Sequence, residues 1–591
     1  MKKIQLHLIG IILIQVCVNS AFPQNKSAEK LLKGLDLYIE NSMKDWEVPG
    51  LAVAVVKDSS LYFAKGYGYR DVEKKLPVTE ETLFAIGSCT KAFTAVSVGL
   101  LGDRGKVELE KPVITYIPTF KMYDDYVTNH ITPLDLMCHR SGLPRHDFVW
   151  YGKNLSRSEL MNTLQYLQPS RGFRSAYQYQ NLMFMAAGVL VEEVAGMKWE
   201  TFISENIFTP LQMKKSNFSV NDMQKSDNFS FPYSKRDDKI VSIPFRNIDA
   251  IGPAGNINSS VLEMSNWMII HLNKGRFNGK EIISGSFLKE THSPQMVASK
   301  TMTDEVFFGS YGLGWFLTSY RGYFRSEHGG GIDGFISSVC LYPNDNLGIV
   351  VLTNYDNAQI TSVIRNYITD RMLGLEEIDW HERIFKPVRE ASEKGEEEKV
   401  GDVSRLKDTK PSFPLEDYTG KYRSPAYGTV TISLSGDTLL AIMEPFLLKL
   451  NHYHLDVFEG EDPDFGKHKL KFHYNIQGEV NMLTINLQAG VPEIEFVREP
   501  DIREMEKADL EKYAGEYDFG GASLKIYVVG ETILKAFIAG QPEYELTPLQ
   551  EHVFALKGLD GYRIIFNLNE KGEVFELISE QPNGSFKAVK K

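Results

Sequence analysis

The hydrophobic pattern divides the chain into a long first part that mixes helical and strand periodicity and a last part made of short alternating runs. Residues 28–43 have helical periodicity, and residues 51–56 form an apolar run suited to a buried strand. Residues 60–64 would pair with that strand as a hairpin. From residue 82 to residue 101 the pattern predicts a helix with one small, packable face.

Strand patterns return at residues 311–315, 334–342 and 347–353, and a helical pattern covers residues 360–373. Strands therefore lie at both ends of this part, with helices between them. This order favours one α/β (α+β) domain whose sheet joins its N-terminal and C-terminal segments.

The composition changes between residues 386 and 410, where glutamates and lysines cluster. Such a run is typical of a solvated helix or a linker. Beyond it, residues 415–422 return in similar form as residues 510–517, and short alternating strands follow each copy. The repeat predicts two tandem β-rich modules, each barrel-like or a half-open sandwich.

These changes give five segments along the chain. They are an export signal at residues 1–20, a main domain at 21–380, a charged linker at 381–412, a first β module at 413–500 and a second β module at 501–591.

The N-terminus has the pattern of an export signal, because two lysines precede an apolar run over residues 4–18 and small residues precede Ala21. The run is shorter than the ~20 residues of a membrane span, so no stable span is expected. Lipid anchoring through Cys17 is the less favoured alternative, because Val16 stands where a small residue is usual. We expect a periplasmic or extracellular protein.

Composition and charge narrow the function classes. The formal net charge of −12 argues against nucleic-acid binding, which needs a basic surface. Removal of the signal leaves three cysteines, an odd number that favours buried thiols over a disulfide framework. His139 and His146 share a loop without further ligands nearby, so neither a metal nor a cofactor is expected.

Ser-x-x-Lys occurs at Ser27, Ser88, Ser286 and Ser404, and only Ser88 begins an apolar helix. Lys91 would lie beside Ser88 on the same helix face. A buried lysine can accept the serine proton, because loss of hydration disfavours the ammonium. The plainer alternative is a capping serine with a solvated lysine.

Two further motifs favour catalysis. Tyr179-Gln180-Asn181 precedes an apolar helix, although Asn181 could simply cap that helix and Tyr179 could be a loop aromatic. Residues 328–334 contain four glycines in seven positions, which lets the backbone approach another group closely.

In this order, these residues resemble the serine β-lactamase and penicillin-binding-protein superfamily, nearest to class C β-lactamases and their esterase and D-aminopeptidase relatives. The resemblance covers residues 28–375 and includes residues 131–143, 252–257 and 348–354. It implies an antiparallel sheet flanked by helices. The two C-terminal modules resemble the small β domains often appended to such hydrolases.

The resemblance implies an acyl-enzyme on Ser88, with Lys91 and Tyr179 sharing the proton relay. Asn181 would hold Lys91 and the substrate by hydrogen bonds. The residues assigned in this way are Ser88, Lys91, Tyr179, Asn181 and His328 for catalysis, Ser88 and Gly331 for the oxyanion hole, and Gly329 and Gly330 for substrate binding.

One departure from the family bears on the substrate. β-Lactamases generally carry Lys-Thr-Gly where this chain has His328-Gly329-Gly330, which weakens recognition of the β-lactam carboxylate. We therefore expect a poor β-lactamase that acts on a small-molecule or peptide substrate, as an esterase or a D-amino-acid-directed peptidase or amidase. The alternatives are an acyltransferase with an alcohol or amine acceptor, and an inactive envelope-binding relative. The oligomeric state stays open.

Overall fold

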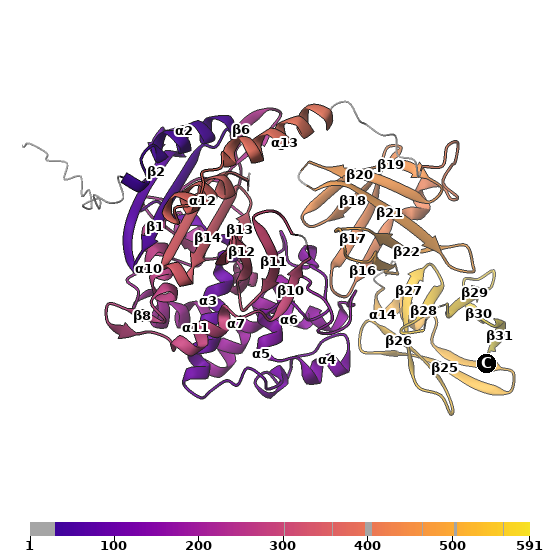
Figure 1. Cartoon of the computed structure of the whole chain (residues 1–591). Helices are drawn as coiled ribbons and strands as arrows, with labels where there is room; N and C mark the ends of the chain where they lie inside the picture. Colours follow the sequence, from indigo (N-terminus) through magenta and orange to yellow (C-terminus); the bar gives the residue numbers. More distant parts are fainter. Residues whose placement is uncertain are drawn as a thin grey trace, which may run out of the picture. The chain divides into compact units, whose positions relative to one another are not determined.

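The computed structural model describes residues 30–300, 302–356, 359–395, 405–463, 465–500, 505–559 and 561–591. The predicted export signal and Cys17 lie outside these residues. The chain forms two compact units, Met1–Val403 and Ser404–Lys591 (Figure 1).

A nine-stranded antiparallel sheet organises the first unit, in the order β10-β11-β12-β13-β14-β15-β1-β2-β3. The predicted hairpin is present, with β1 (Gly50–Lys57) paired to β2 (Ser60–Asp71). β1 also pairs with β15 (Leu347–Thr353), so that Val53 lies opposite Val351. The prediction that the sheet joins both ends of the domain is therefore confirmed. The other strands are β3 (Leu76–Pro77), β10 (Met296–Ser299), β11 (Val306–Tyr311), β12 (Phe316–Tyr320), β13 (Tyr323–Ile332) and β14 (Phe335–Tyr342).

Helices cover both faces of this sheet, which explains why β1 and β15 are apolar at nearly every position. On one face, alternate residues such as Val53 and Val351 share a core with α2 (Leu35–Asp45), α12 (Gln359–Met372) and α13 (Trp380–Gly395). On the other face, α10 (Val261–Leu272) packs on β15 and β1 (Figure 1).

The remaining helices form the body of the unit around the site described below. They are α3 (Thr90–Asp103), α4 (Asp125–His130), α5 (Pro133–Met137), α6 (Arg157–Thr163), α7 (Asn181–Ala195), α8 (Trp199–Ile203), α9 (Val220–Met223) and α11 (Gly285–Thr291). Within the described part of the chain, no helix combines the length and apolar character that crossing a bilayer requires.

The segment assigned to a charged linker starts as an ordered helix. Trp380, the first residue of α13, is buried, and its indole nitrogen donates a hydrogen bond to Asp370 Oδ2 at 2.7 Å. Phe385 in the next turn packs edge-on against Trp46. The first half of α13 therefore belongs to the core beside α2 and α12.

Two expected elements differ from the structure. The helix predicted from residue 82 begins only at Thr90, because Phe84–Ala85 forms a short strand, β4, and Gly87–Cys89 forms a 3-10 turn. β4 pairs with β7 (Asn258–Ser259). The strand predicted at residues 311–315 was also wrong: β11 ends at Tyr311, and Gly314, in the left-handed region, helps to turn the chain into β12.

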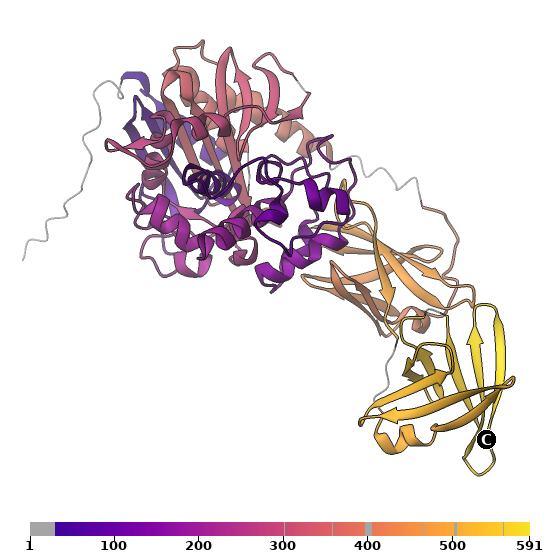
Figure 2. The same ribbon diagram turned by 90° about the horizontal axis from the view of Figure 1, so that it is seen from below.

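The second unit contains two closed eight-stranded barrels, β16–β23 and β24–β31 (Figures 1 and 2). The predicted fold class, a mixed helix and sheet domain followed by two barrel-like modules, is confirmed, and closure excludes the half-open sandwich. The first barrel comprises β16 (Gly420–Ser424), β17 (Gly428–Ser435), β18 (Thr438–Met443), β19 (Phe446–His454), β20 (Val457–Asp462), β21 (Gly466–Tyr474), β22 (Val480–Ile485) and β23 (Ile494–Arg498).

The second barrel follows a short helix, α14 (Lys507–Glu511). It comprises β24 (Gly515–Phe519), β25 (Ala522–Val529), β26 (Ile533–Ile538), β27 (Tyr544–Gln550), β28 (Val553–Leu556), β29 (Arg563–Leu568), β30 (Val574–Gln581) and β31 (Gly584–Lys590).

The internal sequence repeat forms the same corner at the start of each barrel. Tyr422 is fully buried in β16, and its hydroxyl donates to the Tyr418 carbonyl at 2.9 Å. Tyr517 is fully buried in β24, and its hydroxyl donates to the Tyr513 carbonyl at 2.7 Å. The repeat thus marks the residues that tie a helical turn to the first strand.

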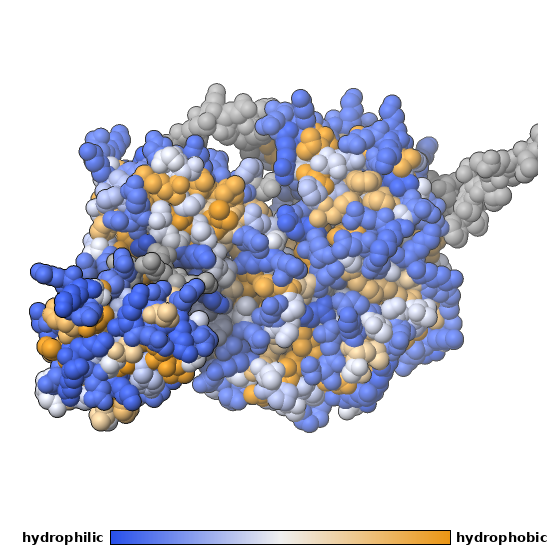
Figure 3. Space-filling view, turned by 180° about the vertical axis from the view of Figure 1, so that it is seen from behind, coloured by the Kyte–Doolittle hydropathy of each residue, from blue (hydrophilic) through white to orange (hydrophobic). Residues whose placement is uncertain are grey.

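The surface and the thiols agree with a folded globular protein. Figure 3 shows polar residues over much of the face that it displays, with apolar residues in smaller groups between them. The described cysteines, Cys89, Cys138 and Cys340, are buried free thiols, as expected from their number.

Replacing either buried corner tyrosine by phenylalanine is expected to destabilise its own barrel by about 1 kcal/mol, because a buried carbonyl loses its partner. Hydrogen exchange of the full chain, followed by mass spectrometry, would show faster exchange in the β16–β17 peptides of Tyr422→Phe and in the β24–β25 peptides of Tyr517→Phe. Tyr474→Phe, at an exposed tyrosine, is the control and should leave exchange unchanged. Equal protection in all three variants would contradict the role of the corner.

Candidate active site

Ser88 lies in the 3-10 turn that joins β4 to α3, and neighbouring segments hold this turn in place. The Ile86 backbone N–H donates to the Ile257 carbonyl at 2.9 Å, beside the β4–β7 pair. The Ser337 hydroxyl donates to the Ile86 carbonyl at 2.7 Å, and the Cys89 thiol donates to the His328 carbonyl at 3.2 Å. The turn is therefore attached to β13 and β14 on one side and to β7 on the other.

Two glycines permit this close approach. Gly87 has a φ of 51°, and a Cβ on it would lie 2.7 Å from Gly331 N. A Cβ on Gly330 would overlap the carbonyl oxygen of Ile86. The glycine-rich segment is thus the end of strand β13. It packs against the turn Gly87–Cys89, here called the nucleophile turn after the predicted role of Ser88, and Ser88 is left half-buried beside it.

Lys91 lies in the first turn of α3, three residues after Ser88, and is completely buried with 0 % exposure. Its Nζ lies 2.9 Å from Ser88 Oγ, 2.8 Å from Asn181 Oδ1 and 2.7 Å from the Ala254 carbonyl oxygen. Burial is the main cause that lowers the pKa of Lys91 well below its ordinary value, and the charge of Arg145 lowers it further. Burial therefore favours the neutral form of the amine next to the serine.

Tyr179 and Asn181 complete this group from the start of α7. Burial raises the pKa of Tyr179 above its ordinary value, and a hydrogen bond with Ser88 opposes part of this effect. Lys91 Nζ lies 4.9 Å from the centroid of the Tyr179 ring. Asn181 does not cap the helix, because the Gln180 side chain accepts the hydrogen bond from the Leu182 N–H. Its amide is free to bind Lys91 instead.

His328 lies behind this group and is 2 % exposed. Its Nδ1 lies 2.6 Å from the Gly329 carbonyl, which can only accept, so Nδ1 carries the proton. Its Nε2 then accepts from the Tyr311 hydroxyl at 2.9 Å. Burial lowers the pKa of His328 to about 3, so the ring is neutral at physiological pH.

The end of β13 presents backbone groups at a sheet edge. β12 pairs with β13 only as far as Glu327, and in the described part of the chain His328–Ile332 pairs on one side only, with β14. Gly329 and Gly331 are exposed on this edge. Gly331 N lies next to the nucleophile turn, in the area assigned to the oxyanion hole.

Several residues that contact Tyr179 and Asn181 were not predicted from the sequence as part of the site. Asp147 Oδ1 accepts from Asn181 Nδ2 at 3.0 Å, and Asp147 Oδ2 accepts from Arg145 Nε at 2.6 Å. The Arg145 guanidinium lies 4.8 Å from the centroid of the Tyr179 ring. His139 packs against the same ring, and its Nδ1 accepts from the Gln180 N–H. The only sequence signal for Arg145 and Asp147 was that two opposite charges follow shortly after residues 131–143.

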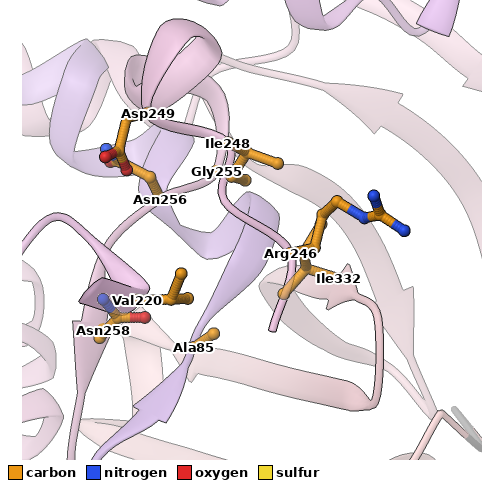
Figure 4. A pocket seen from close by; sticks show the side chains of 9 residues that line it. All are labelled: Ala85, Val220, Arg246, Ile248, Asp249, Gly255, Asn256, Asn258 and Ile332. Atoms are coloured by element: carbon orange, nitrogen blue, oxygen red, sulfur yellow. The ribbon is translucent and has the colours of Figure 1, made fainter. Parts of the chain in front are cut away.

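A small pocket lies near the nucleophile turn, and its lining includes Ala85 of β4 and Ile332 at the end of β13 (Figure 4). Gly255 forms part of it, and a Cβ there would lie 3.7 Å from the Gly87 carbonyl carbon. Asn256 is 5 % exposed, and its amide atoms have no hydrogen-bond partner in the described residues. The pocket leaves about 10 Å³ of free room, which suits one water molecule.

The structure thus brings four of the predicted residues together. Hydrogen bonds join Ser88, Lys91 and Asn181, and the Tyr179 ring lies beside Lys91. Gly329, Gly330 and Gly331 lie on the strand packed against this group. His328 is near it but is turned inward, toward Tyr311. The catalytic roles of these residues stay predictions.

Comparison with known families accounts for most of the first unit. A model of the β-lactamase family matches residues 35–370, more than half of the chain. The chain belongs to the β-lactamase family. Residues 404–498, which include the first barrel, match a domain of unknown function, DUF3471.

Individual relatives agree with this family. The chain is similar to the unguisins hydrolase of Aspergillus campestris, with 29% identity over 67% of this chain and 76% of that protein. Protein flp of Staphylococcus aureus is 26% identical over 57% of this chain and 65% of that protein. The structure of the octameric penicillin-binding protein homologue from Pyrococcus abyssi covers 78% of this chain and 99% of its own, with a TM-score of 0.52 and 21% identity, and shares the fold.

Gly330→Ala is expected to separate β13 from the nucleophile turn, because the added Cβ overlaps the Ile86 carbonyl. We expect a loss of about 1–3 kcal/mol in the free energy of unfolding, as for other overpacked sites, together with a large loss of turnover. Gly329→Ala is the matched control: its Cβ meets only Ser337 O at 3.5 Å, so its stability should equal that of the wild type. Chemical denaturation followed by tryptophan fluorescence measures both. Equal stability of the two variants would contradict the packing described here.

Proposed function

We propose that this chain is a serine hydrolase that acts through an acyl-enzyme on an uncharged ester or amide, as an esterase or a D-amino-acid-directed peptidase or amidase. The observation that carries the proposal is the buried Lys91 amine, bound between Ser88, Asn181 and the Ala254 carbonyl. A solvated lysine beside a capping serine, the plainer alternative, does not fit a side chain with no exposure.

Lys91 is the base for acylation. A neutral amine has two N–H groups, which Asn181 Oδ1 and the Ala254 carbonyl accept, and one lone pair, which then faces Ser88 Oγ. As Ser88 Oγ bonds to the substrate carbonyl carbon, its proton moves to Lys91 Nζ. Burial favours the neutral form that this step needs.

Tyr179 is the acid for the leaving group. Burial raises the pKa of Tyr179 and so favours its protonated hydroxyl, whereas burial lowers the pKa of Lys91 and so favours its neutral amine. Two titratable groups whose environments push them in opposite directions divide the acid and base roles between them. When the ester or amide bond breaks, Tyr179 passes its proton to the departing oxygen or nitrogen, and the proton on Lys91 can then restore the phenol.

Backbone N–H groups stabilise the charge on the substrate oxygen. We assign the oxyanion hole to the N–H groups of Ser88 and Gly331, because Gly331 N lies next to the turn that carries Ser88. One such donor is typically worth ~10²–10³ in rate. We assign Gly329 and Gly330 to the edge along which an extended substrate lies, and His328 to the support of this strand, since both of its ring nitrogens are engaged.

Deacylation runs the same proton path in reverse. Water attacks the acyl carbon while Tyr179 and Lys91 take up its proton, and the bond to Ser88 Oγ breaks as that oxygen regains a proton. The product is the free acid. An acyl transfer to an alcohol or amine would use the same steps with another nucleophile.

The charges at the site favour an uncharged substrate. His328 is neutral and buried where β-lactamases carry a lysine. Arg145 is paired with Asp147, and Arg246 is paired with Asp333 at 2.9 Å. A β-lactam carboxylate would therefore find no free cation among these groups, and the exposed backbone edge suits neutral ester or amide groups.

The relatives support hydrolysis and say less about the substrate. Two proteins that cover two thirds of this chain are named unguisins hydrolases, from Aspergillus campestris and Aspergillus violaceofuscus. We extend to this chain the reaction class of those names, hydrolysis. Export to the periplasm or the extracellular space, inferred from the N-terminal sequence, is part of the same proposal.

Ser88→Ala should lower turnover of an activated ester such as 4-nitrophenyl acetate by at least about 10³-fold and abolish labelling by a fluorophosphonate probe, because no other group supplies the nucleophile. Ser286→Ala is the matched control, since Ser286 begins another Ser-x-x-Lys and is exposed on α11. It should keep full activity. Wild-type turnover by Ser88→Ala would refute the proposed nucleophile.

Nitrocefin should be a poor substrate, with a kcat/KM at least roughly 10–100-fold below that of a dedicated β-lactamase, because one charge-assisted hydrogen bond to its carboxylate is missing. Steady-state assays on nitrocefin with this protein and with a class C β-lactamase, run side by side, provide the measurement, and a neutral ester shows that the preparation is active. A nitrocefin efficiency comparable with that of the β-lactamase would show that the substrate carboxylate is recognised after all.

A further inference from the structure

Arg145 and Asp147 form an ion pair beside both proton-transfer groups: Arg145 lies over the Tyr179 ring, and Asp147 is linked to Lys91 through Asn181. Asp147 accepts the Asn181 Nδ2 hydrogen bond, which orients the amide so that Asn181 Oδ1 faces Lys91 Nζ. Arg145 lies over the Tyr179 ring, and its Nε donates to Asp147. The cation therefore lies beside the acid, and the carboxylate is one residue away from the base.

We propose that Arg145 and Asp147 are positioning residues with opposed charges: Arg145 favours the deprotonated forms of Lys91 and Tyr179, and Asp147 limits this effect while it orients Asn181. The proposal rests on the proposed function, because it concerns the protons that Ser88 and the leaving group exchange.

The direction of each electrostatic effect supports this division. After burial, the charge of Arg145 is the next cause that lowers the pKa of Lys91, and Asp147 raises it. Burial raises the pKa of Tyr179, the hydrogen bond with Ser88 lowers it, and again Arg145 lowers it and Asp147 raises it. The two members of the pair thus act with opposite sign on both groups.

The other titratable groups around Lys91 and Tyr179 are uncharged near neutral pH. Burial lowers the pKa of His139 well below its ordinary value and that of His328 to about 3, so neither ring is charged. Burial raises the pKa of Cys89 to about 12 and raises those of Tyr177 and Tyr311 as well. These groups come from the nucleophile turn, the loops around residues 139 and 177, β11 and β13. Among the groups that act on Lys91 and Tyr179, Arg145 and Asp147 therefore carry the charge.

The test is the pH dependence of kcat/KM for a neutral activated ester, measured on the full chain. Loss of the cation in Arg145→Gln raises the pKa of Lys91, so a larger fraction is protonated and the acid limb moves to higher pH. Loss of the carboxylate in Asp147→Asn leaves the cation unopposed, so the acid limb moves to lower pH. Each shift should be roughly 0.5–1 pH unit, because the Arg145 side chain is about half-exposed and solvent partly screens the charges of the pair.

Two controls separate charge from structure. Arg145→Lys keeps the cation and should restore the wild-type acid limb, even if turnover falls. Arg246→Gln removes a second arginine that lies over a tyrosine ring, Tyr151, and is paired with an aspartate, Asp333. Because its charge is not among the causes that shift Lys91 or Tyr179, its acid limb should stay at the wild-type pH.

Shifts of Arg145→Gln and Asp147→Asn in opposite directions support the proposal. Shifts in the same direction, or loss of turnover with an unmoved acid limb, would overturn it in favour of a structural role. If Asp147→Asn fails to fold, Arg145→Gln and Arg145→Lys decide alone, since only the first should shift. Retained turnover in Ser88→Ala would instead show that the proposed function had failed, which keeps the two failures distinct.

Discussion

The burial of one amine, that of Lys91, is the constraint on which the rest of the first unit depends. Its partners come from three distant parts of the chain: Ser88 before α3, Asn181 at the start of α7, and the carbonyl of Ala254. Their oxygens lie within 2.7–2.9 Å of Nζ. An amine without these partners would cost folding free energy and would swing toward solvent. The packing of α3 against α7 therefore has a chemical consequence, because it holds Lys91, the proposed base, in place.

The approach of β13 to the nucleophile turn is the second constraint, and it follows from missing side chains. Gly87 and Gly330 let two backbones meet where any Cβ would collide. The contact is then sealed by Ser337 and Cys89, whose side chains donate to backbone carbonyls across it. His328 is neutral and faces inward, so this strand presents backbone rather than charge to a substrate. The fold of the β-lactamase family is thus combined with a site in which Arg145 is paired with Asp147 and Arg246 is paired with Asp333.

The second unit repeats one design with its own cores. Each barrel begins with a helical turn and a buried tyrosine that closes a corner, and each fills its interior with apolar side chains. Within this unit, Arg563 of the second barrel donates to Glu479 of the first at 2.7 Å. The repeated sequence therefore reports a shared architecture, because its tyrosines close the same corner in both barrels.

The sequence by itself determined the local elements and the chemical inventory. Uninterrupted apolar runs identified β1 and β15, and glycines at 329–331 indicated a close backbone approach. Ser88, Lys91, Tyr179 and Asn181 supplied a candidate nucleophile and its candidate partners. The sequence shows these features because each pattern depends on neighbours in the chain. Only the tertiary structure decided that the helix begins at Thr90, that Gln180 caps α7, and that Arg145 and Asp147 lie near Lys91. The cap itself is a local contact, but the Pro144 carbonyl, 36 positions away, binds the amide of the same Gln180 side chain. The other facts depend on contacts between residues tens or hundreds of positions apart, and burial and charge act through such contacts.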